Sequence, residues 1–98
     1  MTATKLAAIL KEQGLPVRTV SECTEDEDAT VYLTERVHAQ ISEGGGTFYT
    51  LNIDAPPSEE DDFWTWTGKE YASVTDDLIA DLRAAIKDPD AYIASFPD

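Results

Sequence analysis

Alternation of apolar and polar side chains in the middle of the chain constrains the fold more than any other feature. Between residues 31 and 41 the apolar side chains share one parity, with Glu35 as the exception: Val31, Leu33, Val37, Ala39 and Ile41. A period of two over this length indicates a strand with one buried face. We predict one long strand here with an irregularity near Glu35. Two short strands that break at Glu35 are the alternative.

A glycine-rich turn and a second alternating run follow. Residues 42–46 (SEGGG) predict a tight turn, because glycine accepts the positive φ angles that such turns need. Residues 47–54 then pair back as the next strand, and Pro56 and Pro57 end it. Three side chains of this strand share one face: Tyr49, Leu51 and Ile53.

A further strand is predicted at residues 63–67, where Trp64 and Trp66 would share a face. The strand would end there, with Gly68 and Lys69 starting the segment that follows it. Upstream, residues 17–23 are rich in β-formers and predict a short strand. The polar residues 24–28 (TEDED) between that strand and the long one predict a hairpin turn.

Helices are predicted at both ends of the chain. Residues 3–13 carry an apolar stripe, with Thr2 or Thr4 as cap, Gly14 past the end and Pro16 blocking continuation. A second helix begins at a Ser73 or Thr75 cap, and its buried stripe comprises Leu78, Ile79, Leu82, Ala85 and Ile86. Asp88 and Pro89 then cap and open a short terminal helix, which docks through Tyr92, Ile93 and Phe96.

These elements predict an α+β fold in a single domain, residues 1–98. An N-terminal helix leads into a three- to four-stranded antiparallel meander. A C-terminal helix and a short terminal helix follow, and the helices pack on one face of the sheet. The other face of the sheet is expected to be wetter.

Negative charge is the strongest compositional signal. Twenty Asp and Glu stand against seven Lys and Arg, which leaves a net charge of −13. Such a chain repels nucleic acid and anionic membranes, so we expect neither as a direct partner. Two acidic groups fall on predicted connections: Glu22, Glu25, Asp26, Glu27 and Asp28, and then Asp54, Glu59, Glu60, Asp61 and Asp62.

No catalytic or metal-binding motif is recognisable, and we predict a protein that is not an enzyme and uses no cofactor or metal. His38 is the only histidine and Cys23 the only cysteine, so neither a catalytic triad nor a zinc site is indicated. Asp26 and Asp28 have the spacing of a calcium loop, but Val31 occupies the position that needs glycine. The single cysteine, and an apolar N-terminal run too short for a signal peptide, lead us to expect a soluble cytoplasmic protein.

The two acidic groups suggest that the chain imitates DNA. A domain of this size spans roughly 25 Å, over which duplex DNA carries about 15 phosphates, about half of them on one side. Two loops of five carboxylates match that number, provided that a regular meander brings both loops to the same end of the sheet. Trp64 and Trp66 beside the second group are candidate apolar anchors; the competing interpretation is that both are core residues.

In its size, charge and clustered acids the chain resembles small phage-encoded inhibitors, such as DNA-mimic anti-CRISPR proteins and restriction inhibitors. The resemblance extends to no sequence motif. It implies stoichiometric binding to a basic, DNA-contacting surface of a host nuclease complex in the host cytoplasm. Two alternatives compete with it. One is an interaction module such as an immunity protein or an antitoxin partner. The other is a halophile protein whose acidity is an adaptation to salt, which predicts evenly spread acids and unfolding at low salt.

Overall fold

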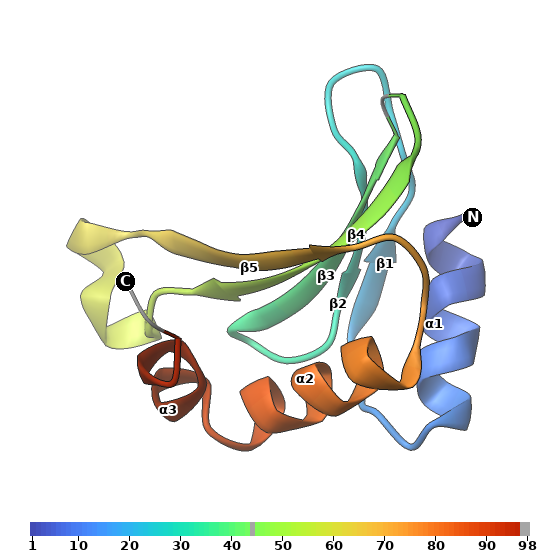
Figure 1. Cartoon of the computed structure of the whole chain (residues 1–98). Coiled ribbons are helices and arrows are strands. Elements are labelled where there is room, and N and C mark those ends of the chain that lie inside the picture. Colours follow the sequence, from blue (N-terminus) through green and yellow to red (C-terminus); the bar gives the residue numbers. More distant parts are fainter. Residues whose placement is uncertain (44, 97–98) are drawn as a thin grey trace.

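The computed structural model describes residues 1–43 and 45–96, apart from the side chains of Glu59 and Glu60. The elements follow one another as a helix, four strands, a short 3₁₀ helix, a fifth strand and two helices (Figure 1). Their bounds are α1 Ala3–Glu12, β1 Thr19–Ser21, β2 Ala29–Tyr32, β3 Val37–Glu43, β4 Thr47–Asp54, η1 Pro57–Asp62, β5 Thr65–Tyr71, α2 Asp76–Lys87 and α3 Pro89–Ala94.

The strands form one antiparallel sheet in the order β1-β2-β3-β4-β5. This confirms the α+β meander flanked by an N-terminal helix and two C-terminal helices. The sheet has five strands instead of three or four, because the segment predicted as one long strand is two strands.

The chain reverses between β2 and β3, close to Glu35, so the prediction of one continuous strand was wrong and the alternative of two strands is correct. Thr34 makes the turn, since its Oγ1 accepts hydrogen bonds from the amides of Arg36 (3.3 Å) and Val37 (3.0 Å). The amide of Leu33 closes the turn by donating to the carbonyl of Val37 at 2.9 Å. Val31 therefore pairs with Ala39 across the two strands.

This extra reversal changes which loops lie together. The β1–β2 loop and the β3–β4 turn now lie at one end of the sheet, and the β2–β3 turn and the β4–β5 connection at the other (Figure 1). The two acidic groups therefore lie at opposite ends, contrary to the expectation of a shared end. The eight residues of β4 alone separate the ends by roughly 25 Å.

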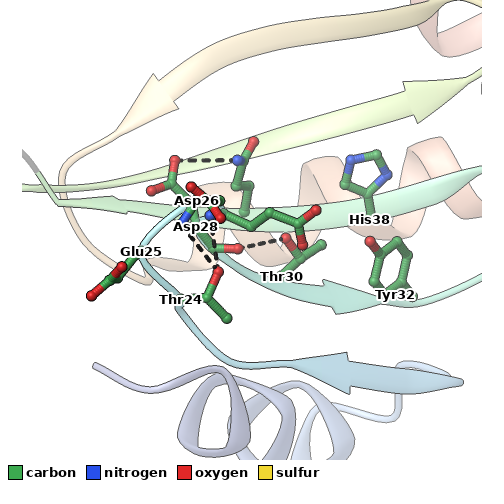
Figure 2. Close-up of a pocket in the computed structure, with 9 residues that line it drawn as sticks. Thr24, Glu25, Asp26, Asp28, Thr30, Tyr32 and His38 are labelled. Atoms are coloured by element: carbon green, nitrogen blue, oxygen red, sulfur yellow. Dashed lines mark hydrogen bonds between the residues drawn. The ribbon is translucent and has the colours of Figure 1, made fainter.

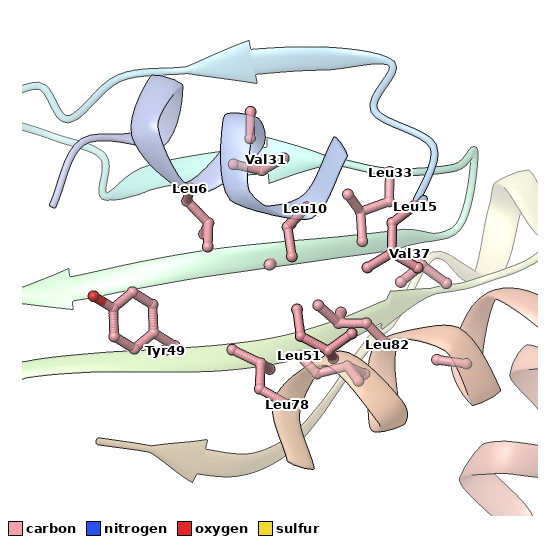
Figure 3. Close-up of a cluster of buried hydrophobic side chains, with 14 of the residues drawn as sticks. Leu6, Leu10, Leu15, Val31, Leu33, Val37, Tyr49, Leu51, Leu78 and Leu82 are labelled. Atoms are coloured by element: carbon pink, nitrogen blue, oxygen red, sulfur yellow. The ribbon is translucent and has the colours of Figure 1, made fainter. Parts of the chain in front are cut away.

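One face of the sheet carries the core. The alternating apolar side chains predicted for this face are buried, Val31, Leu33, Val37 and Ile53 completely so. Helix α1 packs over β1 and β2 and helix α2 over β3 and β4, where Leu6, Leu10, Leu78 and Leu82 meet the sheet residues (Figure 3). Burial of these branched side chains, at about 1.5–3 kcal/mol each, is the main force that holds the layers together.

The helix ends confirm most of the predicted capping. Thr2 caps α1 by accepting from the amide of Lys5, and Asp88 caps α3 by accepting from the amide of Ala91, both at 3.1 Å. The cap of α2 is Thr75 and not Ser73, since the Thr75 hydroxyl accepts from the amide of Leu78. Gly14 adopts the left-handed φ of 80° expected just after α1.

Strand β5 is shifted from its predicted position. It begins at Thr65 and runs through Gly68 and Lys69 to Tyr71, because a bulge opposite β4 absorbs one extra residue and lets pairing continue. A Cβ at Gly68 would lie 3.2 Å from the indole ring of Trp66, so a larger residue there would require the ring to shift slightly.

Candidate functional site

The first acidic group forms the loop between β1 and β2, residues 22–28, which we call the acidic loop. Thr24 organises its backbone. The Thr24 hydroxyl accepts hydrogen bonds from the amides of Asp26 (3.3 Å) and Glu27 (3.0 Å), and the Thr24 amide donates to the Glu27 carbonyl at 2.8 Å. The loop is therefore a compact turn, and the side chains of Glu25, Asp26 and Glu27 are exposed to solvent.

Glu22 at the start of the loop has a structural partner. Its carboxylate accepts hydrogen bonds from the Thr4 hydroxyl and from the amides of Ala3 (2.8 Å) and Thr4 (3.0 Å), which are the first amides of α1. The hydrogen bonds from the Thr4 hydroxyl and the Ala3 amide lower the pKa of this carboxyl. Glu22 thus ties the acidic loop to the positive end of the α1 dipole.

Asp28 at the other end of the loop is also tied down. Its Oδ2 accepts from Gln40 Nε2 and from the Ser42 hydroxyl, both at 3.3 Å. Gln40 and Ser42 belong to the face of β3 that the helices leave uncovered. The acidic loop therefore bends over the uncovered face of the sheet.

A polar hollow lies beside the loop on this face, with a volume of about 420 Å³. Figure 2 shows Glu25, Asp26 and Asp28 on one side and the rings of Tyr32 and His38 on the other. The lining residues are Thr24, Glu25, Asp26, Glu27, Asp28, Thr30, Tyr32, His38 and Gln40. Four carboxylates face no Lys or Arg in this lining, so the hollow is a region of negative potential.

His38 is less exposed than its place on the polar parity predicted. Its side chain is only 15% exposed, and its ring packs against Tyr32 with 5.5 Å between ring centroids. Nδ1 lies 3.4 Å from Asp54 Oδ2 without hydrogen-bond alignment, and no other described group bonds to it. Burial lowers the pKa of His38, and the nearby Asp54 carboxylate opposes that shift.

The second acidic group is split between a buried and an exposed part. Asp54 ends β4 and is mostly covered; its Oδ1 accepts from the Thr65 hydroxyl at 2.8 Å. Asp61 and Asp62 are exposed at the end of η1. Glu59 and Glu60, also predicted as partner-binding residues, have side chains outside the described part of the structure.

The two tryptophans predicted as anchors take different positions. Trp66 points toward the core and makes edge contacts with Tyr92 and Phe96, at centroid distances of 5.9 and 5.1 Å. Trp64 precedes the strand and is 38% exposed, and Phe63 before it is 70% exposed. β5 starts at Thr65, so Trp64 lies just outside the predicted strand, and only Trp66 makes these ring contacts with the C-terminal helix region.

Two arginines lie at the end of the sheet away from the acidic loop. Arg18 precedes β1 and Arg36 lies in the β2–β3 turn, where it pairs with Asp90 at 2.9 Å. No Lys or Arg occurs between residues 19 and 35 or between 37 and 68. At the acidic end the N-terminal amino group lies 4.0 Å from Glu43. The strands next to the acidic loop thus contribute no compensating cation.

Sequence reasoning identified the carboxylates of the site but missed its neutral members. Thr30, Tyr32, His38 and Gln40 share one parity of β2 and β3, so alternation placed them on the uncovered face. What the sequence lacked was a signal that the acidic loop bends toward that face. The anchoring hydrogen bonds of Asp28 cross 12 and 14 residues, a range that local patterns do not reveal.

Other kinds of site find little support. Among the described residues no group of three His, Cys, Asp or Glu side chains is placed to hold a metal ion. No helix in the described part of the chain is long and apolar enough to cross a membrane. Comparisons of the chain with protein-family models, curated proteins and solved structures return no match.

Proposed function

We propose that this chain is a non-enzymatic acidic protein that binds and blocks a basic, DNA-contacting surface of another protein. A nuclease complex of a host defence system, such as a CRISPR complex, has a surface of this chemistry. One observation carries the proposal: the acidic loop places Glu25, Asp26, Glu27 and Asp28 around one hollow on the uncovered face of the sheet.

The hollow has the groups that a basic side chain prefers. Carboxylates accept the paired hydrogen bonds of a guanidinium, and the ring of Tyr32 offers an aromatic face for cation–π contact. Tyr32 is 37% exposed, so a visiting cation can reach it. A DNA-contacting surface displays several Arg and Lys side chains close together, and the surrounding acids would steer it toward the hollow.

Because the two acidic groups lie at opposite ends of the sheet, the proposed contact surface includes only one of them. The order of the strands keeps the two groups on separate surfaces, because β3 and β4 lie between them. The acidic loop is therefore the proposed contact surface by itself. Glu22 and Asp54 are left out of it, because they do not line the hollow and their carboxylates accept hydrogen bonds from α1 and from Thr65. Asp28 lines the hollow and adds its charge, while its Oδ2 is held by Gln40 and Ser42.

Competition with DNA tests this function. The purified protein is immobilised and incubated with a lysate of the cells in which it naturally acts, at low salt, and a 20-base-pair duplex is then added. We expect a basic DNA-binding protein to be retained and then released by the duplex, because both ligands occupy the same surface. Retention that duplex DNA does not disturb would contradict the proposal.

A second candidate function is an interaction module that uses apolar anchors, as an immunity protein or antitoxin partner would. The exposed rings of Phe63 and Trp64 favour it. The same competition experiment separates the two candidates, since a partner held by apolar anchors is not displaced by DNA.

A further inference from the structure

We infer that residues 61–64 form a second docking surface, which we call the aromatic junction, and that its occupant is a cationic amphipathic segment of a partner protein. The junction joins η1 to β5 and contains Asp61, Asp62, Phe63 and Trp64. It lies at the end of the sheet opposite the acidic loop. The inference is therefore independent of the function proposed for that loop, and it deepens the second candidate function, which also rests on Phe63 and Trp64.

Two large exposed rings in succession mark the junction. Phe63 is 70% exposed and Trp64 38%. The other large exposed hydrophobic residues of the described chain, Met1, Tyr32 and Phe48, are not adjacent in sequence to one another. Exposed neighbouring aromatics are typical of interaction sites, where they supply large contact area with few rotatable bonds.

Hydrogen bonds fix the backbone of the junction at Trp64 and Thr65. The Ala55 amide donates to the Trp64 carbonyl at 2.8 Å, which extends the pairing of β4 and β5 beyond the strand end. Next to it the Thr65 hydroxyl donates to Asp54, and Trp66 is packed against Phe96. A partner would therefore meet a preformed segment, and ordering it on binding would cost little.

Charge selects the occupant. Asp61 and Asp62 are exposed beside the rings, and no Lys or Arg occurs between residues 37 and 68. Arg36 lies at the same end of the sheet, but its guanidinium already donates to the Asp54 carbonyl and to Asp90, both at 2.9 Å. A purely apolar partner would remove water from the carboxylates without pairing them, which is unfavourable. A purely cationic partner would leave the rings in water. A second copy of the chain brings another net charge of −13 and is repelled.

A cationic amphipathic segment can both cover the aromatic rings and pair with the carboxylates. Its apolar face covers Phe63 and Trp64, and its Lys or Arg side chains pair with Asp61 and Asp62. Helices of this kind commonly dock through an apolar face with charges at its border. The buried rings would supply most of the affinity, and the rim charges would select the partner and its orientation.

Two synthetic peptides test the inference. One is a Lys/Leu peptide of about 18 residues that forms an amphipathic helix, and the other is an oligo-lysine with the same number of lysines. The Trp66→Phe variant leaves Trp64 as the only tryptophan, so its fluorescence reports on the junction. We expect the Lys/Leu peptide to shift Trp64 emission to the blue and to bind about tenfold more tightly than oligo-lysine, a difference of about 1.4 kcal/mol.

Variants of the junction separate the contribution of the aromatic rings from that of the carboxylates. Phe63→Ser should remove the preference for the Lys/Leu peptide, and Asp61→Asn with Asp62→Asn should weaken both peptides. Glu25→Gln with Glu27→Gln, which removes the same charge from the acidic loop, should leave the blue shift intact. Equal binding of the two peptides, or Lys/Leu binding without a change at Trp64, would overturn the inference. If Trp66→Phe does not fold, the Trp64 indole resonance of the ¹⁵N-labelled wild-type protein serves as the reporter instead.

Discussion

The acidic residues of this protein are not equivalent at the scale of single side chains. Glu22, Asp28 and Asp54 accept hydrogen bonds from named partners and belong to the fold. Glu25 and Glu27 project into solvent beside the hollow. The net charge of −13 therefore combines structural carboxylates with carboxylates that are available to a partner.

Glu22→Gln should lower the thermal unfolding midpoint at pH 7, because the charged acceptor for the first amides of α1 is lost. The pKa of Glu22 is lower in the folded than in the unfolded chain. Its stabilising contribution is therefore present at neutral pH and disappears as the pH falls through the folded-state pKa. Wild type and variant should converge in acid when melted by circular dichroism. Glu25→Gln removes the same charge from the same loop and is the control; an equal loss of stability in both variants would argue against a structural role for Glu22.

His38 should make the fold sensitive to mild acid. Because burial lowers its pKa below 6.5, the unfolded chain binds the proton more readily than the native state. Stability should therefore fall as the pH drops from about 7.5 through 6.5 toward the lower folded-state pKa. His38→Gln should lose less stability than wild type over that range, measured by urea titration at each pH. A steeper loss in the variant would show that Asp54 outweighs burial.

At the scale of elements, the turn between β2 and β3 is the feature with the largest consequence. Residues 31 and 33 before it and 37, 39 and 41 after it keep the same parity. Alternation therefore predicted which side chains are buried but could not distinguish a straight strand from a reversed one. Residues 33–36 contain no glycine or proline, and the turn depends on the Thr34 hydroxyl, which is a weak signal in sequence.

Thr34→Ala should destabilise the fold by about 1 kcal/mol, the usual contribution of such hydrogen bonds, because the amides of Arg36 and Val37 lose their acceptor. Urea unfolding followed by circular dichroism measures the change. Thr47→Ala at the start of β4, an exposed position, is the matched control. If the two variants lose the same stability, the Thr34 hydroxyl does not hold the turn.

The helices at the two ends of the chain could be predicted, because their signals lie within short stretches of sequence. Their caps and apolar stripes are local, so Thr2, Asp88 and the buried residues Leu78 and Leu82 were identified correctly. The extent of β5 was not. The bulge that carries pairing past Gly68 depends on the register with β4, which the sequence of β5 alone does not contain.

At the scale of the whole molecule, the sheet order decides how the charge is arranged. The structure places one acidic group at each end of a molecule measuring 32 × 29 × 27 Å, whereas the sequence suggested a common surface. The number of chain reversals in the meander determines at which end of the sheet each loop lies. The unpredicted turn between β2 and β3 therefore moves the second acidic group to the end opposite the first. The carboxylates of the candidate site could be named from the sequence, but not which of them lie at the same end of the sheet.

Salt should stabilise the protein without being required for folding. Screening of the net charge of −13 reduces self-repulsion, so the thermal midpoint should rise between 20 mM and 1 M sodium chloride. The apolar core between the sheet and the helices on its covered face should keep the chain folded at 20 mM. Circular dichroism at the two concentrations checks this. A chain that is unfolded at 20 mM would instead favour acidity as an adaptation to high salt.

The most direct test of the central claim, that the acidic loop is the contact surface, compares two variants of equal charge. Glu25→Gln with Glu27→Gln neutralises the loop, and Glu12→Gln with Glu70→Gln removes the same charge from α1 and β5. Retention of the DNA-displaceable partner by each immobilised protein is measured at one salt concentration. We expect the loop variant to lose at least about tenfold in affinity, or about 1.4 kcal/mol, and the control to stay near wild type. Equal losses in both variants would contradict the claim and show that only total charge matters.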